Sequence, residues 1–254
     1  MTNAQDQVKQ WAAVADAYVH SSFHAAGPDL ARLVAEASFE GHETVLDLGC
    51  GAGHTSLACA ARAANVVAVD VTPQMVSAAT ALARERGVQN VEFRVADVQA
   101  LPFEDQSFDV VTSRVSAHHY ADAPRAVAEA FRVLKPGGRL LVSDSVSPEE
   151  PALDTFLNCV ELLRDGSHVR NYSWSDWQCM LESAGFVSDS VELFAVHLDG
   201  SEWVTRSRTP ASKVAILREL FGEANAATRH SFTVADEPWG FSIPILLMKG
   251  TKRR

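Results

Sequence analysis

The sequence predicts a doubly wound α/β fold built on one mostly parallel sheet. From Thr44 to about Val146, short runs of β-branched and apolar residues alternate with alanine-rich helical stretches, which is the pattern of a parallel sheet covered by helices. Three glycines spaced two apart follow the first of these runs. The chain of 254 residues is long enough for one such domain with an elaborated cap, and short for two.

Seven strands are expected in the sheet. Five of them form its core, at Thr44–Leu48, Asn65–Asp70, Val91–Ala96, Asp109–Arg114 and Arg139–Asp144. Two more lie near Val191–Val196 and at Phe241–Met248, and the last strand is expected to run antiparallel to the others. Because Pro244 inside the last strand has no N–H to donate, a bulge or a local sheet edge is needed there.

Two helices of the core carry terminal signals. Thr72 followed by Pro73 is an N-cap and first-turn pair, and Gly87 ends the same helix. A second helix, Pro124–Leu134, stops at the turn cluster 135–138. Further helices are expected through Met180–Ala184 and near Ser212–Leu220.

Two segments outside the core are predicted to cover it. Trp11, Val14, Ala15 and Tyr18 fall at i, i+3, i+4 and i+7, the spacing of an amphipathic helix that must dock on something. After the fifth strand, an apolar helical repeat runs into the polar and aromatic stretch Arg164–Trp177, which indicates an insertion over a site. The expected divisions of one domain are N-terminal lid helices at 1–40, the core at 41–146, a cap insertion at 147–187, and C-terminal strands and helices at 188–254.

Composition and charge narrow the class of protein. The 22 Lys and Arg residues against 32 Asp and Glu residues give a net charge of −10, and such a surface repels the phosphate backbone of a nucleic acid. The longest apolar run falls far short of the roughly 20 residues that span a bilayer. Residues 1–10 lack a basic-then-apolar signal. We therefore expect a cytoplasmic protein with no membrane or nucleic-acid partner.

The cysteines give no sign of a metal or redox centre. No two of the four cysteines are separated by just two residues, so they form neither a zinc ribbon nor a paired-cysteine redox motif. They are Cys50, Cys59, Cys159 and Cys179. In a reducing cytosol they are expected to be free thiols.

The strongest functional signal is the glycine loop after the first predicted strand. Gly49, Gly51 and Gly53 let the backbone approach a ligand closely at the carboxyl end of that strand. A dinucleotide-binding loop has the spacing G-x-G-x-x-G, whereas this one has G-x-G-x-G. Asp47, just before the first glycine, would repel a pyrophosphate but attract an ammonium group. The loop therefore favours a zwitterionic ligand over a dinucleotide.

Two more carboxylates end strands on the same edge of the sheet. Asp70 closes the second predicted strand, where it can accept hydrogen bonds from both hydroxyls of a ribose. Asp97 follows the third predicted strand. The alternative for each acid is a role as an N-cap or loop residue.

Together these residues resemble the class I S-adenosylmethionine-dependent methyltransferases, in particular the branch of the ubiquinone and menaquinone C-methyltransferases (methyltransferase type 11) and many small-molecule methyltransferases. The matching segments of the core are 47–53, Asp70, Ala96-Asp97, 101–103 ahead of 107–109, and 132–138. Outside the core, Tyr18, Ser21, His24 and the stretch 164–170 are similar to uncharacterised bacterial members. The resemblance implies a Rossmann-like fold, S-adenosylmethionine as methyl donor, S-adenosylhomocysteine as product, and no metal.

The resemblance also implies roles for residues of the core. The three loop glycines would line the methionine part of the cofactor, Asp47 would act on its amino group, directly or through water, and Asp70 would bind its ribose. Val71 and Met75 would face the adenine ring, although Met75 also suits the core.

Asp97 and Val98 would lie at the edge of the adenine. The expected cofactor-binding residues are Tyr18, His24, Asp47, Gly49, Cys50, Gly51, Gly53, Asp70, Val71, Met75, Ala96, Asp97, Val98, Ser113 and Arg114.

Two histidines follow the fourth strand on the same rim, where the methyl group would lie. His119 is the candidate general base, because imidazole titrates near neutral pH, and His118 and Tyr120 are expected to contact the acceptor. One of the histidines could instead be a buried structural residue. Many methyltransferases of this fold need no base, since the sulfonium is already a good leaving group and alignment lowers the barrier.

The insertion supplies the other acceptor-binding candidates. Arg164, His168, Arg170 and Tyr172 combine cations and aromatic rings, which suits a planar or anionic acceptor. The alternative is a surface network of Arg164 and Asp165 beneath a tryptophan that closes the core.

The function expected from the sequence is methyl transfer from S-adenosylmethionine to a small cyclic or aromatic molecule, at carbon, nitrogen or oxygen. Two alternatives stay open. One is a quinone-ring C-methyltransferase of primary metabolism, and the other is a non-catalytic sensor or scaffold that binds S-adenosylmethionine. A nicotinamide oxidoreductase is disfavoured by the glycine spacing. The expected partner is a small-molecule acceptor, with a homodimer as one candidate assembly.

Overall fold

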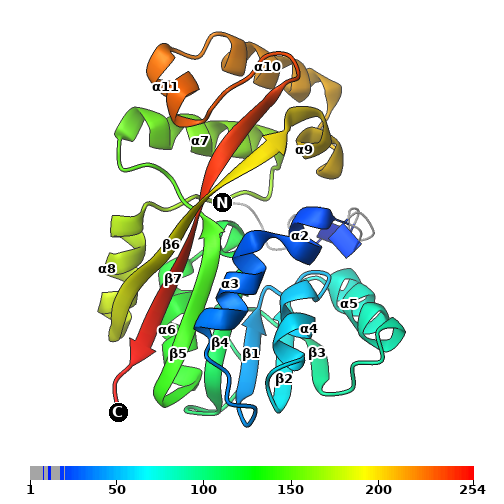
Figure 1. Cartoon of the computed structure of the whole chain (residues 1–254), viewed down its shortest axis with the longest axis vertical. Coiled ribbons are helices and arrows are strands. Elements are labelled where there is room, and N and C mark those ends of the chain that lie inside the picture. The colour runs from blue at the N-terminus through cyan, green and yellow to red at the C-terminus, as the bar shows by residue number, and fades with distance from the viewer. Residues whose placement is uncertain (1–7, 9–10, 13–17, 20) are drawn as a thin grey trace.

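The computed structural model describes residues 8, 11–12, 18–19 and 21–254. Its centre is a seven-stranded sheet with the strand order β3-β2-β1-β4-β5-β7-β6 (Figure 1). β7 pairs antiparallel with both of its neighbours, and the other strand pairs are parallel. The strands are β1 Thr44–Leu48, β2 Asn65–Asp70, β3 Val91–Val95, β4 Phe108–Arg114, β5 Leu134–Ser145, β6 Phe186–Asp199 and β7 Gly240–Lys252. The predicted mostly parallel sheet with a reversed last strand is confirmed.

Helices cover both faces of the sheet, because alternate side chains of each strand point to opposite sides. Val45 packs with α3 and α4 on one face, and its neighbour Leu46 packs with α6 and α8 on the other. α5 lies against β2 and β3. These helices are α3 Pro28–Glu36, α4 His54–Ala60, α5 Pro73–Glu85, α6 Ala123–Val133 and α8 Trp174–Ala184.

The strand order creates a switch point between β1 and β4. From β1 the chain moves outward through β2 to β3, and then returns to the other side of β1 to form β4 and β5. At such a point the loops leaving the carboxyl ends of the strands diverge, and a crevice forms between them. The predicted glycine loop and both predicted carboxylates lie at this end of the sheet.

The strand boundaries follow the predictions most closely near the centre of the sheet. β1 and β2 have the predicted bounds, whereas β6 and β7 are longer because they pair with each other far beyond the end of β5 (Figure 1). Pro244 pairs with Ala195 of β6, one residue past the last β5 pair, between Ser145 and Ile245. The sequence predicted either a bulge or a local sheet edge at this proline, and the structure has the local edge.

The N-terminal part of α5 differs in one detail from its prediction. Thr72 occupies the N-cap position, but its side chain makes no capping hydrogen bond. The backbone N–H of Thr72 instead donates to Oδ1 of Asp70 over 2.8 Å. Gly87 follows the helix at φ +68°, a conformation that suits glycine.

The predicted lid region, 1–40, is not one unit. α3 belongs to the core, since Leu33 is fully buried against the sheet. Ahead of it stands α2, Ser22–Ala26. Of the predicted amphipathic stripe, Val14 and Ala15 lie outside the described residues, and Trp11 and Tyr18 meet edge to face with ring centroids 5.1 Å apart.

The cap also differs from its prediction, because it is assembled from two separate stretches of chain. α7, from the predicted insertion, packs with α9, α10 and α11 around the end of β6 and the beginning of β7 (Figure 1). α8, the second helix of the predicted insertion at 147–187, packs instead on α6 and β6. The cap helices are α7 Pro151–Arg164, α9 Gly200–Arg206, α10 Ala211–Gly222 and α11 Ala226–Ser231. None of the helices described is both long and apolar enough to cross a membrane.

Candidate active site

A large cavity lies at the switch point of the sheet, over the carboxyl ends of β1, β2, β3 and β4. Its empty volume is about 1100 Å³, part of it open to solvent. Its wall combines residues of the glycine loop with residues that follow each of the other strands. Those predicted to bind a cofactor and found in this wall are Tyr18, His24, Gly49, Cys50, Gly51, Asp70, Val71, Met75, Asp97, Val98 and Arg114.

Packing leaves no room for a side chain at two of the three loop glycines, whereas Gly51 has open space and a φ of +51°. Gly49 has φ +62°, and a Cβ atom there would lie 2.7 Å from Oγ of Ser116. Gly53 is absent from the cavity wall. It is the N-cap of α4 at φ +88°, where a Cβ atom would crowd Ala79 and Phe93. The third glycine therefore serves helix packing, whereas Gly49 and Gly51 face the cavity.

Asp70 is anchored to the glycine loop. Its Oδ2 accepts a hydrogen bond of 2.9 Å from the N–H of Gly51, and its Oδ1 accepts the bond from Thr72. Burial raises the pKa of this carboxyl above its usual value. Because each carboxylate oxygen has further lone pairs, Asp70 can also accept hydrogen bonds from a ligand in the cavity.

Asp47, in contrast, lies behind the cavity rather than in its wall. Its carboxylate accepts hydrogen bonds from Oγ of Ser56 at 2.6 Å and Oγ1 of Thr112 at 2.8 Å. Burial raises its pKa to about 6. The geometry does not support the predicted direct contact with an amino group, because both oxygens face groups of α4 and β4.

Of the residues predicted to bind near the adenine ring, some line the larger cavity and one does not. Met75 is 2% exposed and packs with Tyr18 and Ala52 while lining the cavity. Asp97 is exposed at the rim, where its Oδ1 accepts a hydrogen bond from the N–H of Gln99. Ala96 is absent from the wall.

Ser113 also lies outside the wall and instead holds Tyr120. Its Oγ is 3.0 Å from the hydroxyl of Tyr120 and 3.1 Å from Oγ of Ser116. Tyr120 lines the large cavity, and its hydroxyl donates to the carbonyl of Leu48 over 3.2 Å. This chain of hydroxyls joins the ends of β1 and β4.

Arg114 makes a buried ion pair that the sequence did not reveal. Its guanidinium donates to both oxygens of Asp29, over 2.6 and 2.9 Å, and to the carbonyl of His24. Oγ of Ser143 donates to the same carboxylate. Asp29 stands in the first turn of α3, where an acid has an ordinary explanation in the helix dipole, so its sequence position gave no sign of this role.

A second, smaller cavity lies beside the first, between the sheet and the cap. It encloses about 500 Å³, part of it open, and shares Trp11, Tyr18, His24, Val115 and His119 with the larger cavity. Its remaining wall comes from the short helical turn η1, at Ala117–His119, and from β5, β6, β7, α7 and α9. The wall residues that belong to the smaller cavity alone are His118, Ser145, Glu161, Arg164, Leu198, Trp203, Arg206, Ile243 and Ile245.

Val115, in the shared wall, has a strained backbone. Its φ of +50° is rare for a β-branched residue. The N–H of Val115 donates to the carbonyl of Ser143 over 2.8 Å, which helps to hold the residue between the two cavities. Strained residues that the surrounding structure holds in place often mark functional sites.

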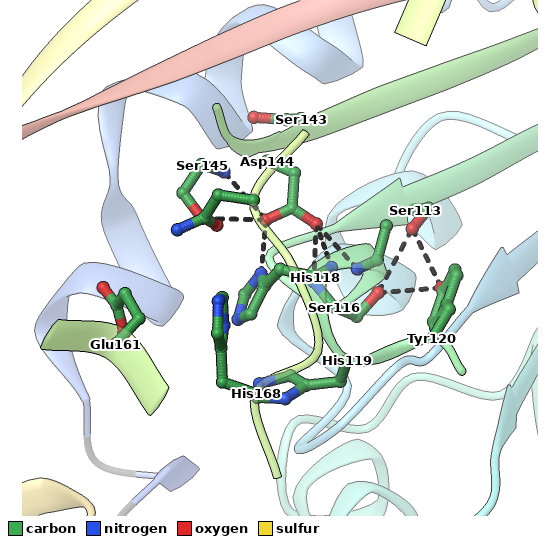
Figure 2. Close-up of polar contacts among 12 residues, drawn as sticks. Ser113, Ser116, His118, His119, Tyr120, Ser143, Asp144, Ser145, Glu161 and His168 are labelled. Atoms are coloured by element: carbon green, nitrogen blue, oxygen red, sulfur yellow. Dashed lines mark hydrogen bonds and ion pairs between the residues drawn. The ribbon is translucent and has the colours of Figure 1, made fainter. Parts of the chain in front are cut away.

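His118, which lines the smaller cavity, makes a short polar contact with Asp144 (Figure 2). Nδ1 of His118, in the turn η1 at Ala117–His119, lies 2.6 Å from Oδ1 of Asp144 at the end of β5. Although burial favours a neutral imidazole, the carboxylate raises the pKa of His118 above its ordinary value. The same interaction and backbone N–H donors hold the pKa of Asp144 below its usual range despite burial.

His119 has a different environment. Its Nδ1 lies 3.1 Å from the carbonyl of Ser167, and a carbonyl can only accept, so this nitrogen carries the proton. Burial and then the neighbouring charge of His118 lower the pKa of His119 to about 3. Its ring meets Trp11 edge to face, with centroids 4.7 Å apart.

The acceptor-binding residues predicted in the insertion divide into two groups. Arg164 lines the smaller cavity. Arg170 pairs with Asp154 over 3.0 Å and stands over the ring of Tyr172, outside both cavity walls. His168 is also outside the walls, with its Nε2 3.1 Å from Oδ1 of Asn158.

The alternative of a surface network is partly right for this segment. Trp177 closes the core at 2% exposed, but Arg164 is buried and pairs with Glu161 rather than with Asp165. Glu161, Trp203 and Arg206 also line the smaller cavity. Their local sequence pattern does not predict this, because it does not indicate that the cap folds over the sheet. Among the residues described, no group of three or more His, Cys, Asp or Glu is arranged to hold a metal ion.

Comparison with known proteins agrees with this geometry. A family model described as a methyltransferase domain matches residues 46–142. The chain is 36% identical over 243 residues to the uncharacterised methyltransferase YcgJ of Bacillus subtilis (strain 168), covering 94% of this chain and 96% of that protein. The crystal structure of YcgJ has a TM-score of 0.86 to this one, covering 89% of this chain and 98% of that chain.

Two other relatives cover less of the chain. An uncharacterised protein, YafE of Escherichia coli (strain K12), is 36% identical over 204 residues, covering 80% of this chain and 98% of that protein. A demethylmenaquinone methyltransferase of Clavibacter sepedonicus is 33% identical over 164 residues, covering 58% of this chain and 66% of that protein. A relative named a methyltransferase matches nearly the whole length of the chain, and the cavity over the glycine loop agrees with that match. The chain therefore belongs to the S-adenosylmethionine-dependent methyltransferases.

Proposed function

We propose that this methyltransferase acts on a small acceptor held in the smaller cavity, with the cofactor in the larger one. The observation that carries the proposal is the shared wall, in which Tyr18, His24, Val115 and His119 border both cavities. Ligands in the two cavities would meet at this wall. The cap, together with Trp11 and Tyr18, would keep water from the meeting point.

The residues of the larger cavity suit S-adenosylmethionine. The bare backbone at Gly49 and Gly51 leaves room for the methionine part, and Asp70 offers free lone pairs to the ribose hydroxyls. Val71 and Met75 supply an apolar wall for the adenine ring. When bound, the cofactor supplies a methyl group on a sulfonium, which needs no further activation as a leaving group.

The chain must then orient the acceptor and accept its proton. The apolar residues of the smaller cavity would align the acceptor, and alignment supplies most of the rate increase in a displacement at carbon. We assign the proton to His118, whose Nδ1 is fixed by Asp144 so that Nε2 is left for the cavity. If the acceptor loses no proton on methylation, its alignment with the methyl group would be enough and no base would be needed.

This assignment differs from the sequence prediction, which placed the base at His119. With its pKa lowered to about 3, His119 is a poor proton acceptor. His118 has its pKa raised by a carboxylate partner and is the better base. His119 would then act as a wall residue that positions both ligands.

The alternatives make different use of the same cavities. A sensor that only binds S-adenosylmethionine needs no acceptor cavity, so the smaller cavity favours an enzyme. The relative named demethylmenaquinone methyltransferase supports a quinone acceptor, but it matches only 58% of this chain.

An acceptor screen with methyl-labelled S-adenosylmethionine tests the proposal. The panel contains small aromatic carboxylates, phenols, amines and naphthoquinols. We expect labelled product from a single-ring acceptor, with stoichiometric formation of S-adenosylhomocysteine. Product from the naphthoquinols alone would establish the quinone alternative. Tight cofactor binding with no labelled product from any class would favour the sensor.

A further inference from the structure

Arg206, at the end of α9, brings an uncompensated positive charge to the smaller cavity. Its side chain lines the cavity and is half-buried. Its Nε atom is buried and has no hydrogen-bond partner, and no carboxylate among the described residues pairs with this guanidinium. The side chain of Tyr18 and, more weakly, the charge of Glu161 interact favourably with it.

The other arginine of the cavity, Arg164, is fully compensated. Its Nη1 lies 3.4 Å from Oε2 of Glu161, its Nε donates to the carbonyl of Trp203 over 3.1 Å, and its guanidinium stands 5.2 Å from the Trp203 ring centroid. Glu161 is therefore in contact with Arg164, and it acts on Arg206 only as the last-ranked electrostatic contribution and not as an ion-pair partner.

The remaining charges of the wall do not change this balance. His118 is matched by Asp144. Burial, together with the nearby charges of Arg206 and Arg114, lowers the pKa of His24 well below its ordinary value, so His24 is neutral. Burial and the charge of Arg164 also lower the pKa of Arg206. An anion entering the cavity would relieve this repulsion.

Much of the rest of the cavity wall is apolar, although Ser145 and His119 also lie in it. Trp203, Ile243 and Ile245 are nearly fully buried and lie on the same cavity. A guanidinium is a planar fork of donors that matches a carboxylate. A ligand that satisfies both features has a compact apolar or aromatic body and one carboxylate.

We propose that the methyl acceptor is a small carboxylate monoanion, anchored by Arg206 with its apolar body against Trp203 and Ile243. The inference rests on the proposed function and narrows its substrate class. A neutral quinone would leave the Arg206 charge unpaired, and a diphosphate would exceed the one available cation.

Calorimetry on the full chain saturated with S-adenosylhomocysteine tests this inference. The probes are benzoate and its neutral analogue benzamide, which differ in charge but little in shape. The variants are Arg206→Gln, Arg206→Lys and, as a matched control, Arg208→Gln, which removes an exposed charge two residues away.

We expect benzoate to bind the wild type at least about tenfold more tightly than benzamide. Arg206→Gln should remove that preference without changing benzamide binding, Arg206→Lys should restore part of it, and Arg208→Gln should behave as the wild type. Unchanged binding of S-adenosylhomocysteine shows that each variant is folded.

Two results would overturn the inference while the proposed function stands. One is equal binding of benzoate and benzamide by the wild type, and the other is an equal loss in Arg206→Gln and Arg208→Gln. A wild type that fails to bind S-adenosylhomocysteine in the same experiment would contradict the proposed function itself, and the inference with it.

Discussion

Nδ1 of His118 lies 2.6 Å from Oδ1 of Asp144, and the same carboxylate accepts backbone N–H bonds from Ala117 and Ser145. These contacts fix the tautomer of His118 with Nε2 unprotonated in the neutral ring. A histidine at the acceptor side and a carboxylate behind it form a pair that can take a proton from the acceptor.

Replacing His118 with Gln should lower the turnover number by ~10²–10⁴, the usual contribution of a general base. Cofactor affinity should stay within about twofold, because His118 does not line the larger cavity. Single-turnover kinetics and calorimetry measure the two quantities. His119→Gln is the matched comparison, and it should lose less turnover. A larger loss in His119→Gln would return the base to the position that the sequence predicted.

The turnover number should rise with pH through an apparent pKa above the ordinary histidine value of about 6.5. The base must be neutral to accept a proton, and Asp144 raises the pKa of His118. Asp144→Asn removes the charge and should shift the midpoint to lower pH. A midpoint at or below 6.5 in the wild type, or the same midpoint in both proteins, would contradict this role of Asp144.

Asp70→Ala should weaken S-adenosylmethionine binding about tenfold to over a hundredfold, since charge-assisted hydrogen bonds contribute roughly 1.5–3 kcal/mol. Asp97→Ala is the control, and its effect should be smaller because Asp97 is exposed at the rim. Calorimetry with S-adenosylmethionine and with NAD measures both affinities, and NAD should not bind. An unchanged affinity in Asp70→Ala would remove this acid from the site.

Asp47 should make the folded protein less stable as its carboxyl ionises. Its pKa is raised to about 6 in the folded state, so folding favours the protonated form, and stability is lost as the pH rises from the unfolded pKa towards and past 6. A shift of this size corresponds to about 3 kcal/mol over the whole titration, of which roughly 2 kcal/mol is lost between pH 4 and pH 7.

Asp47→Asn removes this titration and keeps one acceptor oxygen. Urea unfolding of both proteins, without cofactor, measures the difference in their unfolding free energies at each pH. The stability of the variant relative to the wild type should increase between pH 4 and pH 7. A difference that does not change with pH would show that Asp47 ionises normally.

The helix α2 should close over the cofactor. His24 of α2 borders both cavities, whereas Leu33 of α3 is fixed in the core. Hydrogen exchange in α2 should therefore slow when S-adenosylhomocysteine is added, with no change in α3. Equal exchange in α2 with and without ligand would mean that this segment is a fixed part of the fold.

The cofactor side of the site could be predicted because its residues lie in short segments at strand ends. The bounds of β1 and β2, the loop at Gly49 and the carboxylate of Asp70 follow from local patterns of β-branched residues, glycines and acids. Asp47 shows the limit of such patterns. Its position beside the loop is correct, but the hydroxyls that occupy it come from α4 and β4.

The acceptor side could not be predicted because distant segments build it. Arg206 and Ile243 reach the same cavity as His118 only after the cap folds over the sheet. The pair of Asp29 and Arg114 joins residues 85 positions apart. Apolar periodicity identifies a helix such as α8 but not the layer that it covers, and for this reason the predicted cap included α8.

The measurement that tests the central claim most directly is methyl transfer by a variant with a filled smaller cavity. Ile243 lines that cavity and not the larger one, so Ile243→Trp should block the acceptor and leave the cofactor in place. With the acceptor found in the screen and methyl-labelled S-adenosylmethionine, we predict at least about a hundredfold loss of turnover at unchanged affinity for S-adenosylhomocysteine. Turnover near the wild-type rate at unchanged cofactor affinity would contradict the account and place the acceptor elsewhere.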